Sequence, residues 1–219
     1  MEIKVLRNVL EANDAIAAEN RRLLKARGIY TVNLIASPGA GKTTLLERTL
    51  DALKGEFRMA VVEGDIAGSS DAERIGRHSV PVVQINTGGD CHLNASMVRS
   101  ALESLPLEEI QLLFIENVGN LVCPAGFDIG EDIKVVVLSV AEGDDKPEKY
   151  PLIFERSSAM VLNKIDLMGM VDFDLERARS KARITHPDLP IFELSARTGQ
   201  GMEPWLEWLR ARLSTLHNS

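Results

Sequence analysis

The chain carries the run Ala36-Ser37-Pro38-Gly39-Ala40-Gly41-Lys42-Thr43-Thr44 directly after the apolar segment 30–35. The next segment, 45–53, has leucines at helical spacing, so a strand leads into a glycine-rich turn and then into a helix. Such a turn points backbone N–H groups inward, and the helix start adds the positive end of a dipole. The run predicts a phosphate-binding loop, although alanine stands where the usual pattern begins with glycine.

Two side chains of this loop suit a magnesium triphosphate. Lys42 can reach the β- and γ-phosphates, and the Thr43 hydroxyl can bind a Mg²⁺ ion held by the phosphates. We expect Lys42 to be an exposed loop end when no ligand is bound. A plain glycine turn is the alternative, and the strand-then-helix context opposes it. The predicted phosphate contacts are Gly39, Ala40, Gly41, Lys42, Thr43 and Thr44.

A second motif, Asn163-Lys164-Ile165-Asp166, follows the apolar segment 159–162 and predicts a guanine pocket. An aspartate there can accept hydrogen bonds from N1–H and the exocyclic amine of guanine, whereas adenine would leave it unpaired. A helix capped by Asp166 is the alternative. Ser195 and Ala196 follow another predicted strand and offer a third side, with a backbone N–H for the guanine O6. The predicted base contacts are Asn163, Lys164, Asp166, Ser195 and Ala196.

Length and composition indicate one ordinary soluble domain with appendages at most. The chain has 219 residues, of which 45% are hydrophobic and 26% are charged. A net charge of −7 argues against nucleic acid as the main partner. The longest apolar runs, such as 135–140, are too short to span a bilayer, and the first residues carry no export signal. We therefore expect a cytoplasmic protein whose two cysteines remain thiols.

Strand and helix patterns alternate along the chain, which predicts an α/β fold with a mostly parallel central sheet and helices on both faces. A helical stripe near the N-terminus ends at Gly28 and consists of Ile3, Leu6, Leu10, Asn13, Ala17, Asn20 and Leu24. The predicted strands are 31–36, 58–63, 81–86, 110–115, 133–140, 159–163 and 190–194; the later helices are 43–54, 71–77, 93–104, 174–184 and 203–214. We divide the chain into an N-terminal helix, 1–28, packed on a P-loop domain, 29–219.

Hydrolysis requires groups beyond the phosphate loop. Asp65 and Glu116 stand at the ends of predicted strands and are candidate Mg²⁺ ligands together with Thr43. Gly119 is placed to direct its N–H toward the γ-phosphate. Solvated loop carboxylates are the alternative. Because no glutamine or arginine is obviously placed to assist, we expect slow intrinsic turnover with Lys42, Asp65, Glu116 and Gly119 as the catalytic set.

Both cysteines lie in glycine-rich, turn-prone segments, and one is followed by histidine. Cys91, His92 and Cys123 offer thiolate and imidazole ligands, which suit Ni²⁺ or Zn²⁺ better than Mg²⁺. Buried structural thiols are the alternative. Three ligands do not complete a tetrahedral site, so water, another side chain or a second protomer would be needed.

These motifs together resemble the HypB family, SIMIBI-class P-loop GTPases that incorporate nickel during [NiFe]-hydrogenase maturation. The resemblance covers residues 5–210, and its most specific run is Glu116-Asn117-Val118-Gly119-Asn120-Leu121-Val122-Cys123-Pro124. It implies a GTPase that dimerises with GTP, binds nickel or zinc through Cys91, His92 and Cys123, and passes nickel to the hydrogenase large subunit with HypA, a small zinc-containing partner. Some members have an N-terminal cysteine motif or histidine tract. Here no cysteine precedes Cys91 and no histidine precedes His78, so a nickel-storage role is not expected.

The residues suggest that nucleotide and metal act on one another, because Cys123 follows Glu116 and Gly119 in one loop. Lys146 is a further candidate for a nucleotide contact across a dimer interface, with a solvated surface lysine as the alternative. Three other functions remain open: a related GTPase chaperone for urease or a cobalamin enzyme, a P-loop kinase, and a GTP-binding module without turnover.

Overall fold

A sheet of parallel strands forms the centre of the protein. The structure, a computed structural model, describes the backbone of residues 4–214 and the side chains of residues 10–214. Within that part the sheet has seven strands in the order β3-β2-β4-β1-β5-β6-β7, and every pairing is parallel. The strands are β1 (Tyr30–Ala36), β2 (Met59–Asp65), β3 (Val82–Asn86), β4 (Leu112–Glu116), β5 (Ile133–Ser139), β6 (Ala159–Asn163) and β7 (Ile191–Glu193).

The inner strands are buried on both faces, as expected for a parallel sheet covered by helices. Every residue of β1, β4 and β6 is buried. β4 and β6 are apolar up to their last residues, Glu116 and Asn163, whereas β1 also buries the polar residues Thr31 and Asn33. The predicted fold class is confirmed.

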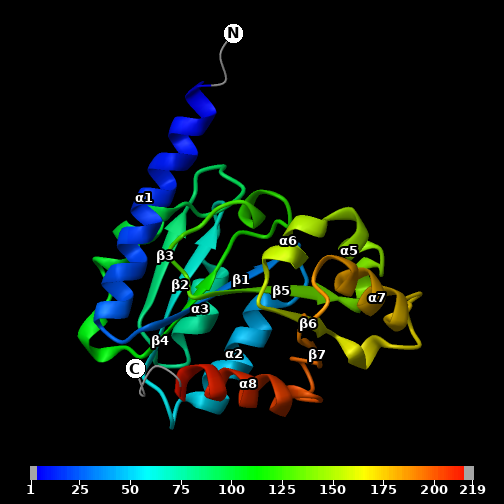
Figure 1. The fold of residues 1–219 in the computed structure, drawn as a ribbon. Coiled ribbons are helices and arrows are strands. Elements are labelled where there is room, and N and C mark those ends of the chain that lie inside the picture. Colours follow the sequence, from blue (N-terminus) through cyan, green and yellow to red (C-terminus); the bar gives the residue numbers. More distant parts are fainter. Residues whose placement is uncertain (1–3, 215–219) are drawn as a thin grey trace.

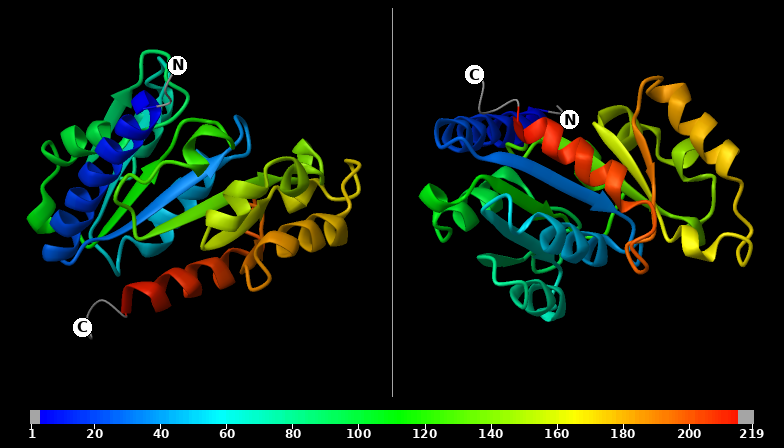
Figure 2. Two further views of the ribbon diagram at one scale, coloured as in Figure 1. Left: turned by 45° about the horizontal axis from the view of Figure 1, so that its top comes forward. Right: turned by 90° about the horizontal axis from the view of Figure 1, so that it is seen from below.

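Helices cover the two faces of the sheet (Figure 2). On one face, α2 and α8 pack in a single core with the even-numbered residues of β1. On the other face, α1 and α4 cover β2 and β4, while α6 and α7 cover β5 and β6. The helices are α1 (Lys4–Ala26), α2 (Lys42–Leu53), α3 (Ser70–Gly76), α4 (Ala95–Leu102), α5 (Lys146–Lys149), α6 (Pro151–Arg156), α7 (Leu175–Thr185) and α8 (Met202–Ser214).

The predicted N-terminal helix is present as α1, and its first turns stand beyond the rest of the fold (Figure 1). It ends shortly before Gly28, whose φ of 66° lies in the left-handed region that favours glycine. Of the predicted stripe, Leu24 is buried but Leu10 is 39% exposed. Ile3 and the side chain of Leu6 lie outside the described residues.

Two short helices, α5 and α6, were not expected from the sequence. Pro147 and Pro151 interrupt the segment and are typical of loops, yet each stands in the first turn of its helix. Proline is tolerated there because the first N–H groups of a helix have no partner within it.

The carboxyl ends of four strands carry predicted ligand-binding residues or lead into the predicted phosphate loop. Ala36, Asp65, Glu116 and Asn163 are the last residues of β1, β2, β4 and β6. In a parallel sheet these ends share one edge, where ligands of α/β proteins bind. Across the described residues, none of the helices has both the length and the apolar character needed to cross a bilayer.

Candidate functional site

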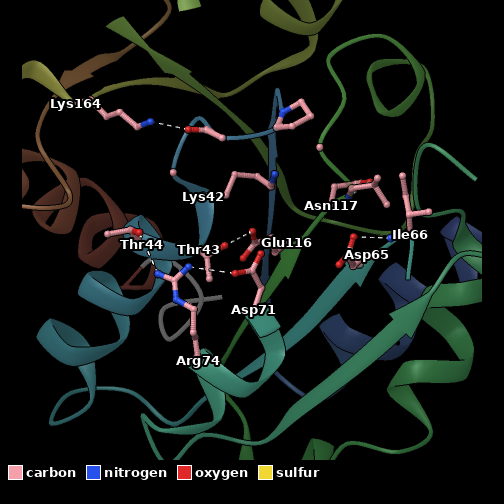
Figure 3. A pocket seen from close by; sticks show the side chains of 16 residues that line it. Lys42, Thr43, Thr44, Asp65, Ile66, Asp71, Arg74, Glu116, Asn117 and Lys164 are labelled. Carbon is pink, nitrogen blue, oxygen red and sulfur yellow. Dashed lines mark hydrogen bonds and ion pairs between the residues drawn. The ribbon is translucent and has the colours of Figure 1, made fainter. Parts of the chain in front are cut away.

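The glycine-rich turn between β1 and α2 has the geometry of a phosphate loop. Gly39 and Gly41 adopt left-handed φ values of 78° and 95°. A Cβ on Gly41 would lie 2.6 Å from Nδ2 of Asn163, so a larger residue cannot fit. A cavity of about 490 Å³ lies beside the turn (Figure 3). Its lining comprises Pro38, Gly39, Gly41, Lys42, Thr43, Thr44, Gly64, Asp65, Ile66, Asp71, Arg74, Glu116, Asn117, Val118, Gly119 and Lys164.

Lys42 is buried, which corrects the expectation of an exposed loop end. It is the first residue of α2 and is only 8% exposed. Its charge lowers the pKa values of Glu63 and Glu116, although burial raises both more strongly. The lysine therefore lines the cavity as a buried positive charge near the carboxyl groups at the strand ends.

Thr43 and Glu116, which were both predicted to bind Mg²⁺, lie in direct contact. The Thr43 hydroxyl donates a hydrogen bond of 2.8 Å to Oε1 of Glu116 (Figure 3). Oε2 of Glu116 is buried and has no hydrogen-bond partner within the described part of the chain. Burial raises the pKa of Glu116 to about 7. An unpartnered buried carboxyl oxygen beside a hydroxyl fits a divalent cation that prefers oxygen ligands.

Glu63 is a third carboxyl group at this edge that the sequence did not single out. It pairs with Glu116 in the register of β2 and β4, and its Oε2 is likewise buried without a partner among the described residues. Burial, followed by the charges of Glu116 and Asp65, raises its pKa to about 8. At neutral pH Glu63 is therefore mostly protonated.

Asp65 and Gly119 both line the cavity, with different surroundings. The Asp65 carboxylate accepts hydrogen bonds from the N–H groups of Ile66 (2.6 Å) and Gly68 (3.0 Å), so it holds its own loop. A Cβ on Gly119 would lie 3.1 Å from N and Cα of Pro38. Glycine thus lets the loop after β4 approach the phosphate loop. The predicted roles of both residues remain predictions.

Arg74 and Asp71, from α3, also line this cavity, and neither was predicted as a site residue. The Arg74 guanidinium donates hydrogen bonds to the Thr44 hydroxyl (3.1 Å), Glu47 (2.6 Å) and Asp71 (3.1 Å). No motif marks single charged residues in a short helix. Only their position shortly after β2 could have indicated that they lie near the carboxyl edge of the sheet.

The second motif forms a smaller cavity of about 330 Å³ that shares Gly41, Thr44 and Lys164 with the first. Oδ1 of Asp166 is buried there without a hydrogen-bond partner in the described part of the chain. The remaining lining residues are Asn163, Asp166, Leu167, Ala196 and Arg197.

The rest of that motif supports the phosphate loop. Asn163 donates from Nδ2 to the Ala40 carbonyl (2.9 Å) and accepts from the Ala196 N–H (3.0 Å). Lys164 donates from Nζ to the Gly39 carbonyl (2.7 Å) (Figure 3). These contacts join the end of β6 to the loop before α2. The segments predicted to bind the base and the phosphates of a nucleotide are therefore held together by hydrogen bonds.

Ser195 is not among the residues that line this cavity. The side chain is fully buried, its N–H donates to the Gln200 carbonyl (2.8 Å), and its hydroxyl accepts from the Thr198 N–H (3.1 Å). A direct contact between Ser195 and a base stays a prediction. The side of the cavity predicted here is formed by Ala196 and Arg197.

The three predicted soft-metal ligands lie together although Cys123 is far from the others in sequence. Their ligand atoms all lie within 4.8 Å of one another. Sγ of Cys91 is 2.7 Å from Sγ of Cys123 and 3.7 Å from Nδ1 of His92, and both thiols are free. Burial lowers the pKa of His92, which favours the neutral imidazole that binds metals. Its ring packs on Phe127 with centroids 4.0 Å apart. The cluster fits a thiophilic divalent ion.

Lys146 lies apart from these groups in the isolated chain. It begins α5, and its ammonium group is 5.6 Å from the centre of the Tyr150 ring. A role across a dimer interface remains a prediction.

A parallel sheet with a glycine-rich phosphate loop and an adjoining base cavity defines a P-loop nucleotide-binding protein. The family description "CobW/HypB/UreG, nucleotide-binding domain" matches residues 30–193. Hydrogenase maturation factor HypB of Azotobacter vinelandii is 49% identical over 213 residues, which cover 97% of this chain and 70% of that protein. The chain belongs to the HypB family.

Two solved structures agree in fold and sequence. Hydrogenase maturation factor HypB from Archaeoglobus fulgidus is 39% identical with a TM-score of 0.87, and the match covers 93% of this chain and all of that one. HypB from Helicobacter pylori, solved in complex with nickel, is 38% identical with a TM-score of 0.89, covering 93% and 96% of the two chains.

Proposed function

We propose that the protein is a GTP-hydrolysing metallochaperone that binds nickel, or zinc, and assists nickel insertion into [NiFe]-hydrogenase. Similarity to proteins named hydrogenase maturation factors, one of them solved with nickel, supports this function. The cavity at Asp166 supports guanine as the base, because its unpartnered Oδ1 would accept from a purine that offers donors.

The phosphate loop, residues 39–44, holds the triphosphate, with Lys42 beside the β- and γ-phosphates. Thr43 and Glu116 bind Mg²⁺, and Asp65 joins them directly or through water. When bound there, the ion would supply positive charge beside the phosphates. Within this chain, Lys42 and the N–H groups of the loop hold the phosphates, and Gly119 brings the loop after β4 toward the γ-phosphate.

One observation carries the combined function: a single loop, residues 117–123, joins the two sites. It begins next to Glu116, which bonds to Thr43, and it ends at the metal ligand Cys123. Between them, Nδ2 of Asn120 donates a hydrogen bond of 3.3 Å to the carbonyl of Cys91. Ordering of this loop by the γ-phosphate would therefore move both thiols.

Under this proposal residues 29–219 form the GTPase domain, and residues 1–28 add a helix. GTP brings two copies together as a symmetric homodimer, with Lys146 near the partner's nucleotide. The protein acts in the cytoplasm with HypA and delivers nickel to the hydrogenase large subunit.

Phosphate release tests the proposed reaction. We expect GTP with Mg²⁺ to yield GDP and free phosphate slowly without any acceptor, and ATP to be a poor substrate. We also expect a Cys91→Ser/Cys123→Ser variant to bind GTP normally but to lose Ni²⁺. Transfer of phosphate to an acceptor would indicate a kinase, and GTP binding without turnover would indicate a regulatory module.

A further inference from the structure

The buried face of α1 contains two asparagines where apolar residues are usual. Asn13 and Asn20 are 7% and 0% exposed, and Ala17, between them on the same face, is also fully buried. They are seven residues apart, so two helical turns place them on one side of α1. Burial of an amide costs free energy unless its donors and acceptors are paired.

Each asparagine binds two separate segments of the chain. Asn13 accepts a hydrogen bond from the N–H of Ala95 (2.9 Å) and donates one to the carbonyl of Asp128 (2.8 Å). Asn20 donates to the carbonyls of Ala95 (2.9 Å) and Ile129 (3.2 Å). The two amides therefore hold the start of α4 and the segment 128–129 side by side.

Those two segments lead directly to the metal ligands. Ala95 comes three residues after His92, and Asp128 comes five residues after Cys123. Phe127, next to Asp128, packs on the ring of His92. Lys134 donates to the carbonyl of Phe127 (2.7 Å), so this connection is itself held in place.

The segment 128–131 also packs tightly on α1. A Cβ on Gly130 would lie 2.6 Å from Cβ of Asn20 and 2.9 Å from the carbonyl of Ala17. Arg21 adds hydrogen bonds of 2.7 and 2.8 Å to the carboxylate of Asp128. Because the backbone touches the helix here, a shift of α1 would move the segment that follows Cys123.

We propose that Asn13 and Asn20 are positioning residues of the metal cluster, and that α1 sets the separation between its two halves. This inference rests on the proposed binding of Ni²⁺ or Zn²⁺ by Cys91, His92 and Cys123. The asparagines touch no metal. They hold the ligand-bearing segments together before the ion arrives, so less ordering is needed on binding.

The test compares Asn13→Ala and Asn20→Ala with the wild-type full chain. Ni²⁺ affinity is measured by competition with a chelator, and coordination by the thiolate-to-nickel absorption band. We expect each variant to bind Ni²⁺ at least tenfold more weakly and to show a shifted band, while GTP affinity stays within twofold. Trp205→Phe is the control, because it removes a buried hydrogen bond to Thr49 on the other face of the sheet. It should lower thermal stability but leave Ni²⁺ affinity within twofold.

A second measurement, made without metal, distinguishes a changed separation of the thiols from a general loss of stability. Diamide oxidises a pair of thiols to a disulfide, taking up two electrons and two protons, so its rate reports how often Cys91 and Cys123 meet. We expect slower oxidation in both asparagine variants and a wild-type rate in Trp205→Phe. Wild-type Ni²⁺ affinity or oxidation rate in the asparagine variants would overturn the inference, as would equal losses in the Trp205 control. Failure of the wild type to bind Ni²⁺ through its cysteines would overturn the proposed function as well.

Discussion

We expect Asp166 to select guanine over adenine. Its Oδ1 is buried and has no hydrogen-bond partner in the described part of the chain, so it is free to accept from the base. Asp166→Asn should weaken GTP binding roughly 100-fold, since the amide offers a donor where guanine also offers donors. The same change should favour xanthosine triphosphate, because its C2 oxygen can accept a hydrogen bond from the asparagine amide. Titration of both nucleotides measures this exchange, with Asp172→Asn on the exposed surface as the control. Equal binding of ATP and GTP by the unaltered protein would refute the assignment.

Lys42 is expected to matter far more for the nucleotide than for the fold. Lys42→Ala removes the cation beside the phosphates and should reduce turnover by roughly 10²–10³-fold, with most triphosphate binding lost. Because Lys42 is buried and its charge lowers the pKa values of Glu63 and Glu116, the variant also removes an attractive charge from these two carboxyl groups. Phosphate release and circular dichroism measured together separate the two effects. Normal turnover in a folded variant would show that the loop does not hold the phosphates.

The packing of α8 on α2 depends on the buried indole of Trp205. Trp205 is fully buried and donates from Nε1 to the Thr49 hydroxyl of α2 (3.0 Å). Trp205→Phe should lower the free energy of unfolding by about 2 kcal/mol, because it removes this hydrogen bond and leaves a small void. Trp208→Phe should cost less, since Trp208 is only partly buried against the same core. Chemical denaturation of both variants gives the comparison, and equal losses would contradict it.

The elements that could be predicted are those whose signal is local. Largely apolar runs marked the inner strands, and the loop before α2 was recognised from glycine, lysine and threonine at fixed spacing. The short helices α5 and α6 were missed because Pro147 and Pro151 have the same local signal in a loop and in a first helical turn.

The site residues that escaped prediction depend on contacts between elements. Glu63 matters only because β2 pairs with β4 and places it beside Glu116. Arg74 matters because α3 packs next to α2, so that it reaches Thr44. The burial of Lys42 likewise depends on contacts between elements and could not be predicted from the local sequence. Asn13 and Asn20 lay visibly in the helical stripe of the sequence, but their partners at Ala95 and Asp128 could not be seen without the fold.

In the whole molecule, the carboxyl edge of the sheet carries the residues predicted to bind the nucleotide, and residues 117–123 connect them to the cluster of Cys91, His92 and Cys123. Gly119 packs on Pro38 of the phosphate loop, and Asn120 bonds to the backbone of Cys91. The segments that follow His92 and Cys123 are in turn hydrogen-bonded to Asn13 and Asn20 of α1. Under the proposed function, a change at the γ-phosphate would therefore reach the thiols through these contacts.

We expect the affinities for nucleotide and metal to be coupled. Couplings of this kind are typically about 1–3 kcal/mol, so Ni²⁺ affinity should differ roughly 5- to 150-fold between GDP and a non-hydrolysable GTP analogue. Cys123→Ala should abolish tight binding and also uncouple metal from turnover, because Cys123 ends the shared loop; Cys91→Ala should mainly lose metal affinity. Calorimetry measures the affinities, and light scattering shows whether the analogue yields a dimer. Both variants should still bind guanine nucleotides. Equal Ni²⁺ affinity in the two nucleotide states would mean that GTP does not control the metal, and wild-type affinity in Cys123→Ala would leave that residue as a buried thiol only.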